Sequence, residues 1–359
     1  MYPNEMIFGD VVIGPGRPPV FLAELGAMFN QDVDLALSLI DQVAVAKKGI
    51  TKIPVMLKGE ILHDPSCCLD DGALVSYRSK SGEAKTERYR DLIERKVLSL
   101  AAYERIIGAC RDREIQVVMS VYDETGAAFA VEQGVVALKT NSGNITNRPL
   151  LRAVAKFNQP MIIDTGRSAL GEVEAAINIA RTAGNERLII QHSPDGHPAA
   201  PEDHHLRAIN TIQRAFNVLT GLSCHSSGTD SLFIALALGA SILEKNIVWD
   251  DTLLEQDYAI SMGIDGFRGI LARIETAWLT LGAPFRDVRR FEGLDDPRTR
   301  YGLIADSDIA SGEILNTKNV RTAFPCKGIP AARYDDVMGW KARTNLQSGT
   351  PIGWFDVEP

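Results

Sequence analysis

The stretch Pro160-Met161-Ile162-Ile163-Asp164 is a short apolar run that ends in a carboxylate, and the segment after it, 170–183, has apolar residues at helical spacing. Similar units recur along the first 250 residues. The eight apolar runs span 20–24, 53–58, 115–120, 135–139, 160–164, 187–192, 217–225 and 241–246. A strand followed by a helix, eight times over, predicts an α/β fold, a closed (β/α)8 TIM barrel with strands buried on both faces.

Each apolar run ends in a polar or ionisable residue. Because the carboxyl ends of all strands in such a barrel meet at one mouth, these side chains should converge there. The eight run-ending residues are Glu24, Lys58, Ser120, Lys139, Asp164, His192, His225 and Asn246. Ionisable groups gathered at one end of a packed core predict an active site.

Composition limits the classes of function. The 359 residues are 45% hydrophobic and carry a net charge of -8, which argues against a nucleic-acid partner. Neither a signal peptide nor an apolar segment of membrane-spanning length is recognisable, so we expect a cytoplasmic protein without a membrane partner. The five cysteines form an odd set without zinc-type spacing, which favours reduced structural thiols.

The remaining segments complete the expected architecture. Residues 6–13 predict a hairpin that closes the amino-terminal end of the barrel, and 265–281 predict a closing amphipathic helix. The polar stretch 60–90 predicts a long loop, either a lid or disordered. We expect a barrel domain over 1–284, an exposed linker over 285–300 and a small second domain over 301–359.

Ordered motifs along the chain resemble the sialic acid synthase family, the NeuB-like enzymes. They span both expected domains: Ala23-Glu24-Leu25-Gly26, Lys139 with Ser142-Gly143, Asn147 to Leu151, Thr165-Gly166, Pro201-Glu202-Asp203, Gly221 to His225, Ala237 to Lys245, and Asp257. The tail resembles the antifreeze-like, or SAF, domain that follows the barrel in that family. Any one of these motifs is weak evidence, but their order and spacing together are specific.

The resemblance implies a condensation of phosphoenolpyruvate with an open-chain sugar aldehyde, giving a 2-keto sugar acid and phosphate. It implies a divalent metal, Mg or Mn, that polarises the aldehyde. It also implies a homodimer in which the small domain of one subunit covers the barrel mouth of the other. The substrates would be small molecules.

The resemblance also implies roles for individual residues. Catalytic roles fall to Glu24, His225, Asp257 and His197, and substrate contacts to Lys58, Glu60, Ser120, Lys139, Ser142, Asp164, His192 and Ser223. Simpler alternatives stay open: Glu24 could form a structural ion pair, Lys58 could extend to the rim, and His192 could be structural. Strand alternation places Ser223 and His225 on one face and Cys224 on the other, which argues against a Cys-His nucleophile pair. We expect His204 and His205 to be exposed.

Four departures from the family pattern lie near the same mouth. Asn246 replaces the second of two metal histidines, and an amide is a poor transition-metal ligand, so metal binding at His225 and Asn246 should be weak or absent. Asp164 replaces a serine that contacts the donor phosphate. His197 replaces a sugar-contacting tyrosine, and Ala323-Phe324-Pro325-Cys326 replaces a stretch whose arginine reaches the N-acetyl group.

These departures predict an acceptor other than N-acetylmannosamine. Two alternatives to the condensing enzyme remain. One is a lyase, aldolase or isomerase that does not use phosphoenolpyruvate and acts through Lys139, Glu24 and His197. The other is a non-catalytic binding protein, although retaining several buried charges that destabilise a fold argues against it.

Overall fold

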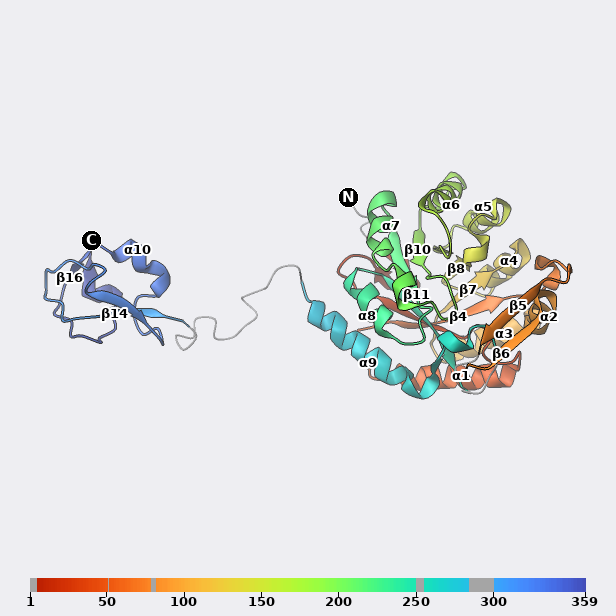
Figure 1. The fold of residues 1–359 in the computed structure, drawn as a ribbon, viewed down its shortest axis with the longest axis horizontal. Helices are drawn as coiled ribbons and strands as arrows, with labels where there is room; N and C mark the ends of the chain where they lie inside the picture. Colours follow the sequence, from red (N-terminus) through yellow and green to blue (C-terminus); the bar gives the residue numbers. More distant parts are fainter. Residues whose placement is uncertain (1–4, 51, 79–81, 250–254, 284–299) are drawn as a thin grey trace. The chain divides into compact units, whose positions relative to one another are not determined.

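The computed structural model describes residues 5–50, 52–78, 82–249, 255–283 and 300–359. Two compact units divide the chain, Met1–Gly282 and Ala283–Pro359 (Figure 1). Apart from Arg300, the expected linker 285–300 lies outside the described residues. In the described part of the chain, no helix is sufficiently long and apolar to cross a bilayer.

The first unit is the predicted closed barrel. Its parallel strands follow chain order, and β11 pairs with β12, which in turn pairs with β3 and closes the sheet. The barrel strands are β3 (Val20–Glu24), β4 (Val55–Ile61), β7 (Val117–Val121), β8 (Ala137–Thr140), β9 (Met161–Asp164), β10 (Leu188–His192), β11 (Leu219–Ser223) and β12 (Ile242–Val248). A short strand β13 (Met262–Gly263) pairs with β12.

Helices surround the strands (Figure 1). They are α1 (Val33–Ala46), α2 (Tyr89–Lys96), α3 (Leu100–Asp112), α4 (Glu124–Glu132), α5 (Arg148–Lys156), α6 (Leu170–Thr182), α7 (Ala208–Phe216), α8 (Asp230–Ala237) and α9 (Ile264–Leu281). Short polar side chains fix several starts: Asp32 accepts hydrogen bonds from the backbone of α1, and Asn147 accepts one from Leu150 in α5. Helix α9 confirms the predicted closing helix.

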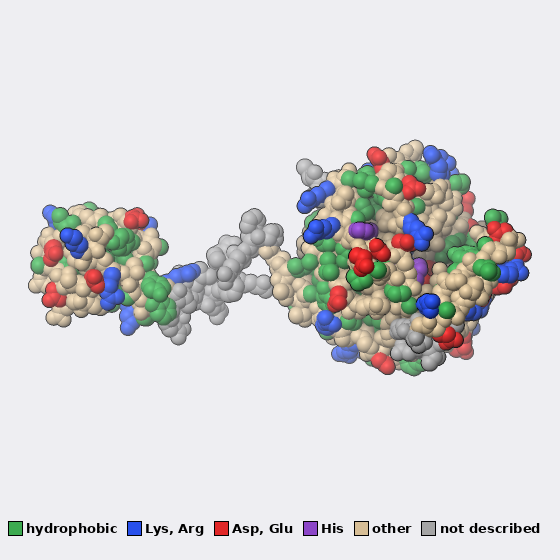
Figure 2. Space-filling view, in the orientation of Figure 1, with side chains coloured by type: hydrophobic (Ala, Val, Ile, Leu, Met, Phe, Trp, Pro, Cys, Tyr) green, Lys and Arg blue, Asp and Glu red, His purple; other side chains and the backbone are tan. Residues whose placement is uncertain are grey.

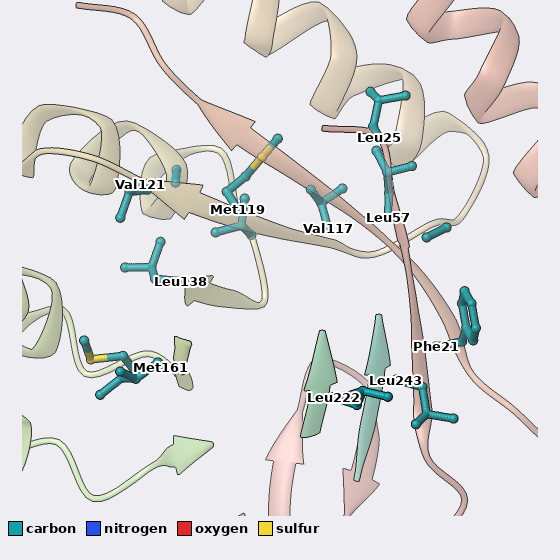
Figure 3. Packing of buried hydrophobic residues seen from close by; sticks show 14 of the residues in the cluster. Phe21, Leu25, Leu57, Val117, Met119, Val121, Leu138, Met161, Leu222 and Leu243 are labelled. Atoms are coloured by element: carbon teal, nitrogen blue, oxygen red, sulfur yellow. The ribbon is translucent and has the colours of Figure 1, made fainter. Parts of the chain in front are cut away.

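Strand alternation sorts the apolar residues into two cores. Outward-facing residues such as Met119, Leu138 and Leu243 pack against the helices, and Figure 3 shows them on β7, β8 and β12 respectively. The inward-facing residues form a second, smaller cluster. Phe8 and Ile13 are fully buried in this inner cluster, and they come from the antiparallel hairpin of β1 (Met6–Phe8) and β2 (Val11–Ile13). The predicted hairpin is therefore confirmed, and it fills the amino-terminal end of the barrel.

The segment 60–90 contains regular structure where the sequence predicted a long loop, either a lid or disordered. Strand β4 continues to Ile61, a short 3-10 helix η1 (Pro65–Cys67) follows, and β5 (Leu74–Arg78) pairs with β6 (Ala84–Arg88) in an antiparallel hairpin. The side chains of Tyr77 and Glu87 hydrogen-bond across this hairpin. Alternation of polar residues on an exposed two-stranded ribbon gives little hydrophobic signal, which is why composition alone indicated a loop.

The second unit has a small core of its own. It contains β14 (Gly302–Ala305), β15 (Val320–Ala323), α10 (Tyr334–Val337), β16 (Lys341–Ala342) and β17 (Val357–Glu358). Leu303, Leu315, Ile329 and Ile352 are fully buried in this core. Strands β14 and β15 pair antiparallel, as do β16 and β17.

Candidate active site

Sheet register and strand alternation bring polar side chains from the ends of the strands together inside the barrel. Asn246 pairs with Glu24 and Glu24 with Lys58 across β12, β3 and β4, while Ser120 pairs with Lys139 across β7 and β8. Gln191 pairs with Asp164, and Ser223 pairs with Glu244. By strand alternation all of these share the inward face with the barrel-filling residues of the inner core. Residues distant in sequence therefore form one polar layer above the apolar inner core of the barrel.

Lys58 lies between two carboxyl groups. Its Nζ donates to Glu24 Oε1 at 2.6 Å and to Glu60 Oε1 at 3.0 Å, and the Lys58 and Glu24 side chains are nearly inaccessible. Burial lowers the pKa of Lys58, but the charges of Glu24, Glu60 and Glu244 outweigh burial and raise it well above its usual value. Burial raises the pKa of Glu24 well above the ordinary range despite the attraction of Lys58. Lys58 is therefore a fixed cation, and Glu24 is a carboxyl that readily holds a proton.

Lys139 has an equivalent environment on the opposite strands. Its Nζ lies 2.9 Å from Asp164 Oδ2 and 2.7 and 2.9 Å from the two oxygens of Glu244. Burial lowers the pKa of Lys139, but the charges of Asp164 and Glu244 outweigh burial and raise it. Burial also raises the pKa of Asp164, to about 6. Each buried lysine of the layer thus lies between two carboxyl groups.

Glu244 connects the two halves of this layer, and sequence reasoning gave it no role. It accepts hydrogen bonds from Lys139, Gln191 Nε2 and Ser223 Oγ, and its carboxyl group also contacts that of Glu24. Burial alone would raise the pKa of Glu244, but Lys139 and Lys58 lower it strongly. Glu244 is therefore the ionised member of the Glu24–Glu244 pair. The sequence offered one indication of this role: Glu244 lies two residues before Asn246, so both side chains face the barrel interior.

Above this layer lies a group of histidines and a carboxylate. The rings of His197 and His225 lie 4.5 Å apart between centroids, and His197 Nε2 is 3.9 Å from Asp257 Oδ1. His225 Nδ1 lies 2.8 Å from the Pro194 carbonyl oxygen, which only accepts, so this nitrogen carries the proton. Burial, followed by the neighbouring His197, lowers the pKa of His225 to about 3. His225 is therefore neutral at physiological pH.

A cleft opens beside these rings. Its volume is about 210 Å³, and it is lined by residues of the loops that follow β8, β9, β10 and β11, including Ser142, Gly166, Pro194, His197 and His225. The predicted residue Ser142 is thus part of its wall. Figure 2 shows acidic, basic and histidine side chains interspersed over the visible face of the barrel unit.

His192 does not line the mouth as predicted. It has the strand parity of the outward-facing Ile190, and its Nε2 donates to the His204 carbonyl oxygen at 2.7 Å. The inward residue at the end of β10 is Gln191. His204 is also buried rather than exposed, and its Nδ1 donates to the Ala200 carbonyl oxygen. Cys224 faces outward toward Ser231, as alternation predicted.

Two features on the rim had no counterpart in the sequence predictions. Tyr122, two residues beyond Ser120, donates to Glu60 Oε2 at 3.1 Å. Arg95 at the end of α2 bridges Glu87 of the hairpin and Glu255, at 2.8 and 3.0 Å. The hairpin segment is therefore tied to the segment that carries Asp257.

Comparison with known proteins agrees with the resemblance seen in the sequence. Residues 64–285 match the NeuB family and residues 301–358 match the SAF domain. The chain belongs to the NeuB family. This NeuB chain is 27% identical over 333 residues to the N,N'-diacetyllegionaminic acid synthase of Campylobacter jejuni, covering 92% of this chain and 98% of the relative. It is 24% identical over 358 residues to the mouse N-acetylneuraminate-9-phosphate synthase, covering 96% and 94%.

Solved structures share the fold. The putative spore coat polysaccharide biosynthesis protein E of Chromobacterium violaceum has a TM-score of 0.77 at 21% identity, covering 95% of the NeuB chain and all of its own. The N-acetylneuraminic acid synthetase of Leptospira borgpetersenii has a TM-score of 0.69 at 24% identity, covering 80% and 98%. The curated relatives thus place the chain in a family of sugar-acid synthases.

The side chains at the predicted metal position of the NeuB chain do not fit a transition-metal centre. Asn246 offers only an amide, and His225 offers one free nitrogen, Nε2, which already lies 3.3 Å from Ser223 Oγ. Over the described ranges of the chain, no three His, Cys, Asp or Glu side chains converge as ligands. We therefore derive no step through a metal.

Proposed function

We propose that this protein is a transferase that condenses phosphoenolpyruvate with a sugar aldehyde to give a 2-keto acid and phosphate. The supporting observation is the buried layer in which Lys58, Lys139 and Glu24 meet at the carboxyl end of the barrel. Two fixed ammonium groups suit a substrate with a carboxylate and a phosphate. Several of the curated relatives are named as synthases of sugar acids, namely legionaminic, pseudaminic and neuraminic acid derivatives, and these names support the same reaction class.

In this proposal the donor carbon C3 forms a bond to the aldehyde carbon, and water adds to C2 before phosphate leaves. Glu24, which holds a proton because it is buried, donates that proton to the developing aldehyde oxygen. Asp257 takes a proton from the attacking water, and His197 orients the Asp257 carboxylate. Burial would raise the pKa of Asp257, but Lys96, His197 and His225 lower it, so the carboxylate is ionised and able to act as a base.

The lyase alternative is less well supported. It requires Lys139 to attack a carbonyl as a neutral amine, whereas Lys139 lies between Asp164 and Glu244 and stays protonated. Ammonium groups have no lone pair for attack. We therefore retain the condensing reaction.

The acceptor remains a sugar or other carbonyl compound different from N-acetylmannosamine, because His197 occupies the tyrosine position and the family arginine has no counterpart at 323–326. Phosphate release from phosphoenolpyruvate should be measured against a panel of aldoses, including N-acetylmannosamine, with mass detection of the keto acid. Release that depends on an aldose supports the proposal. A carbonyl adduct trapped on Lys139 by borohydride, without phosphate release, would favour the lyase.

We also propose that the protein acts as a homodimer whose small domain covers the partner's mouth. Light scattering of the full chain should give twice the monomer mass of 39.2 kDa. A truncation ending at Gly282 should lose acceptor-dependent turnover if the second unit completes the site.

A further inference from the structure

Lys96, the last residue of α2, is a largely buried cation whose hydrogens are unused. Its side chain is 11% exposed, and within the described ranges its Nζ donates no hydrogen bond and forms one ion pair, with Glu255 Oε2 at 3.9 Å. That oxygen is buried and accepts no hydrogen bond in the same part of the chain. Unused hydrogen-bonding capacity is costly in a protein interior, so a donor and an acceptor left open side by side indicate a ligand that serves both.

Arg95 already balances the charge of Glu255. Its Nε and Nη2 lie 3.2 and 3.0 Å from Glu255 Oε1, and its Nη1 lies 2.8 Å from Glu87 Oε2. The carboxylate of Glu255 is thereby tied to the hairpin of β5 and β6, which lies beside α2 (Figure 1). Because Arg95 holds one oxygen of Glu255, the other oxygen is left to face Lys96. Lys96 is therefore not needed to neutralise Glu255, and its hydrogens stay available.

The open pair adjoins the base of the proposed reaction. Asp257 follows Glu255 by two residues, and its Oδ1 lies 3.9 Å from His197 Nε2. Burial lowers the pKa of Lys96, but Asp257, Glu255 and Glu60 outweigh burial and raise it. Glu60 belongs to β4 and contacts Lys58 in the polar layer. Lys96 therefore faces the mouth of the barrel, on the side where an aldehyde substrate would meet Asp257.

Tyr89 extends this group along α2. It begins the helix seven residues before Lys96, so the two side chains share one face, two turns apart. Leu92 lies between them on that face and is fully buried, which shows that the face is turned toward the protein. The Tyr89 side chain is 40% exposed, and its hydroxyl makes no hydrogen bond within the described residues. An accessible ring with a free hydroxyl suits a ligand that has both C–H and O–H groups.

We propose that Lys96, Glu255 and Tyr89 form a subsite that binds a hydroxyl group of a polyhydroxylated aldehyde substrate. This inference rests on the proposed function and names the class of its aldehyde. Lys96 Nζ donates to the hydroxyl oxygen, which in turn donates its hydrogen to Glu255 Oε2. One oxygen about 2.8 Å from each atom fits a separation of 3.9 Å. An ionised carboxylate has no hydrogen for Glu255, and an ammonium has no lone pair for Lys96.

The test pairs a variant with a missing hydroxyl. It uses the full-length protein, the aldose of highest kcat/KM in the phosphate-release panel, and the monodeoxy analogues of that aldose, at pH 8, where carboxylates are ionised. Lys96→Met should raise the KM for the aldose about 10- to 100-fold while kcat changes less than about threefold, because the hydroxyl is held equally before and during the reaction. One monodeoxy analogue should show the same rise in KM with wild type, and no further rise with Lys96→Met.

Two further variants sharpen the comparison. Glu255→Gln keeps a carbonyl oxygen for Arg95 but replaces the open acceptor with an amide donor, so it should raise KM for the aldose and not for that same analogue. Lys156→Met removes an exposed lysine from the last turn of α5 and should behave as wild type with every substrate.

The outcomes separate this inference from the proposed function. If Lys96→Met lowers kcat and leaves KM unchanged, or raises KM equally for the aldose and all its deoxy analogues, Lys96 only supports Asp257 and the subsite is wrong. Aldose-dependent phosphate release by wild type would still support the condensation in that case. If wild type releases no phosphate with any aldose, both proposals fail. Should Lys96→Met not fold, Glu255→Gln with the same analogues decides the question.

Discussion

Lys139 Nζ lies 2.7 Å from Glu244 Oε1, although 105 residues separate the two in sequence, and both side chains are at most 3% exposed. The pair joins β8 to β12 across the interior of the barrel, where the intervening strands contribute Asp164, Gln191 and Ser223. Such a contact is electrostatically strong only because the other hydrogen-bonding positions of Glu244 are also filled.

Glu244→Ala should lower the free energy of unfolding by about 3–5 kcal/mol, because it leaves the Lys139 charge buried with one partner fewer. Glu244→Gln should cost less, since it retains an acceptor oxygen. Denaturant unfolding of both variants checks this expectation. Asp34→Asn, which removes an exposed contact with Arg105, is the control and should change stability by less than about 1 kcal/mol. If Glu244→Ala and Asp34→Asn lowered the free energy of unfolding equally, the Lys139–Glu244 contact would not stabilise the fold.

Asp164 should make stability depend on pH. Its folded-state pKa of about 6 lies above its ordinary value, so the stabilisation it provides is fully present below the ordinary value and is lost as pH rises through about 6. Wild type should lose on the order of 2 kcal/mol from this group between pH 4 and 7. Subtracting the profile of Asp164→Asn from that of wild type isolates the contribution. A difference that stays constant with pH would show that the carboxyl is not perturbed.

His192 and Gln191 should have separable roles. His192→Ala removes a buried hydrogen bond to the His204 carbonyl, so it should lower the free energy of unfolding by about 1–3 kcal/mol with donor affinity unchanged. Gln191→Ala removes the contact with Glu244 and should weaken binding of phosphoenolpyruvate about tenfold, equivalent to about 1.4 kcal/mol. Thermal unfolding and calorimetric binding measure the two effects. If His192→Ala weakened donor binding and Gln191→Ala lowered only stability, His192 would belong to the site instead.

Arg95→Met should impair turnover more than stability. Arg95 is 37% exposed, so its ion pairs with Glu87 and Glu255 contribute less than about 1 kcal/mol. Releasing Glu255 would misplace Asp257 and lower kcat/KM by about 10- to 100-fold. Steady-state kinetics with the best acceptor of the aldose panel test this, and Arg105→Met, which removes only an exposed contact, is the matched control.

The sequence predicted the barrel because each strand is an apolar run closed by a polar residue, a strong and repeated signal. It also placed Glu24, Lys58, Lys139 and Asp164 correctly at one mouth, since strand ends converge in any parallel barrel. The error at His192 arose because the last residue of a run need not face inward. A shift of one position exchanges the two faces of a strand, and only the register of β10 shows that Gln191 is the inward residue.

Other parts of the site depend on contacts that no local pattern encodes. Glu244 gains its importance from partners on four other strands, and its sequence neighbours Leu243 and Lys245 are buried as deeply. The hairpin of β5 and β6 is held by polar contacts such as the one between Tyr77 and Glu87. Composition cannot distinguish such a ribbon from a coil, because neither buries an apolar face.

The hairpin of β1 and β2 has a kinetic consequence. Phe8 and Ile13 close the amino-terminal end of the barrel. Substrates and products therefore enter and leave at the carboxyl-terminal end. In the proposed reaction the anionic donor would lie deepest, against Lys139, so it would bind before its co-substrate blocks the passage, and phosphate would leave after the bulkier sugar acid. Compulsory-order kinetics, with inorganic phosphate inhibiting competitively against the first reactant, would follow from this dead-end geometry.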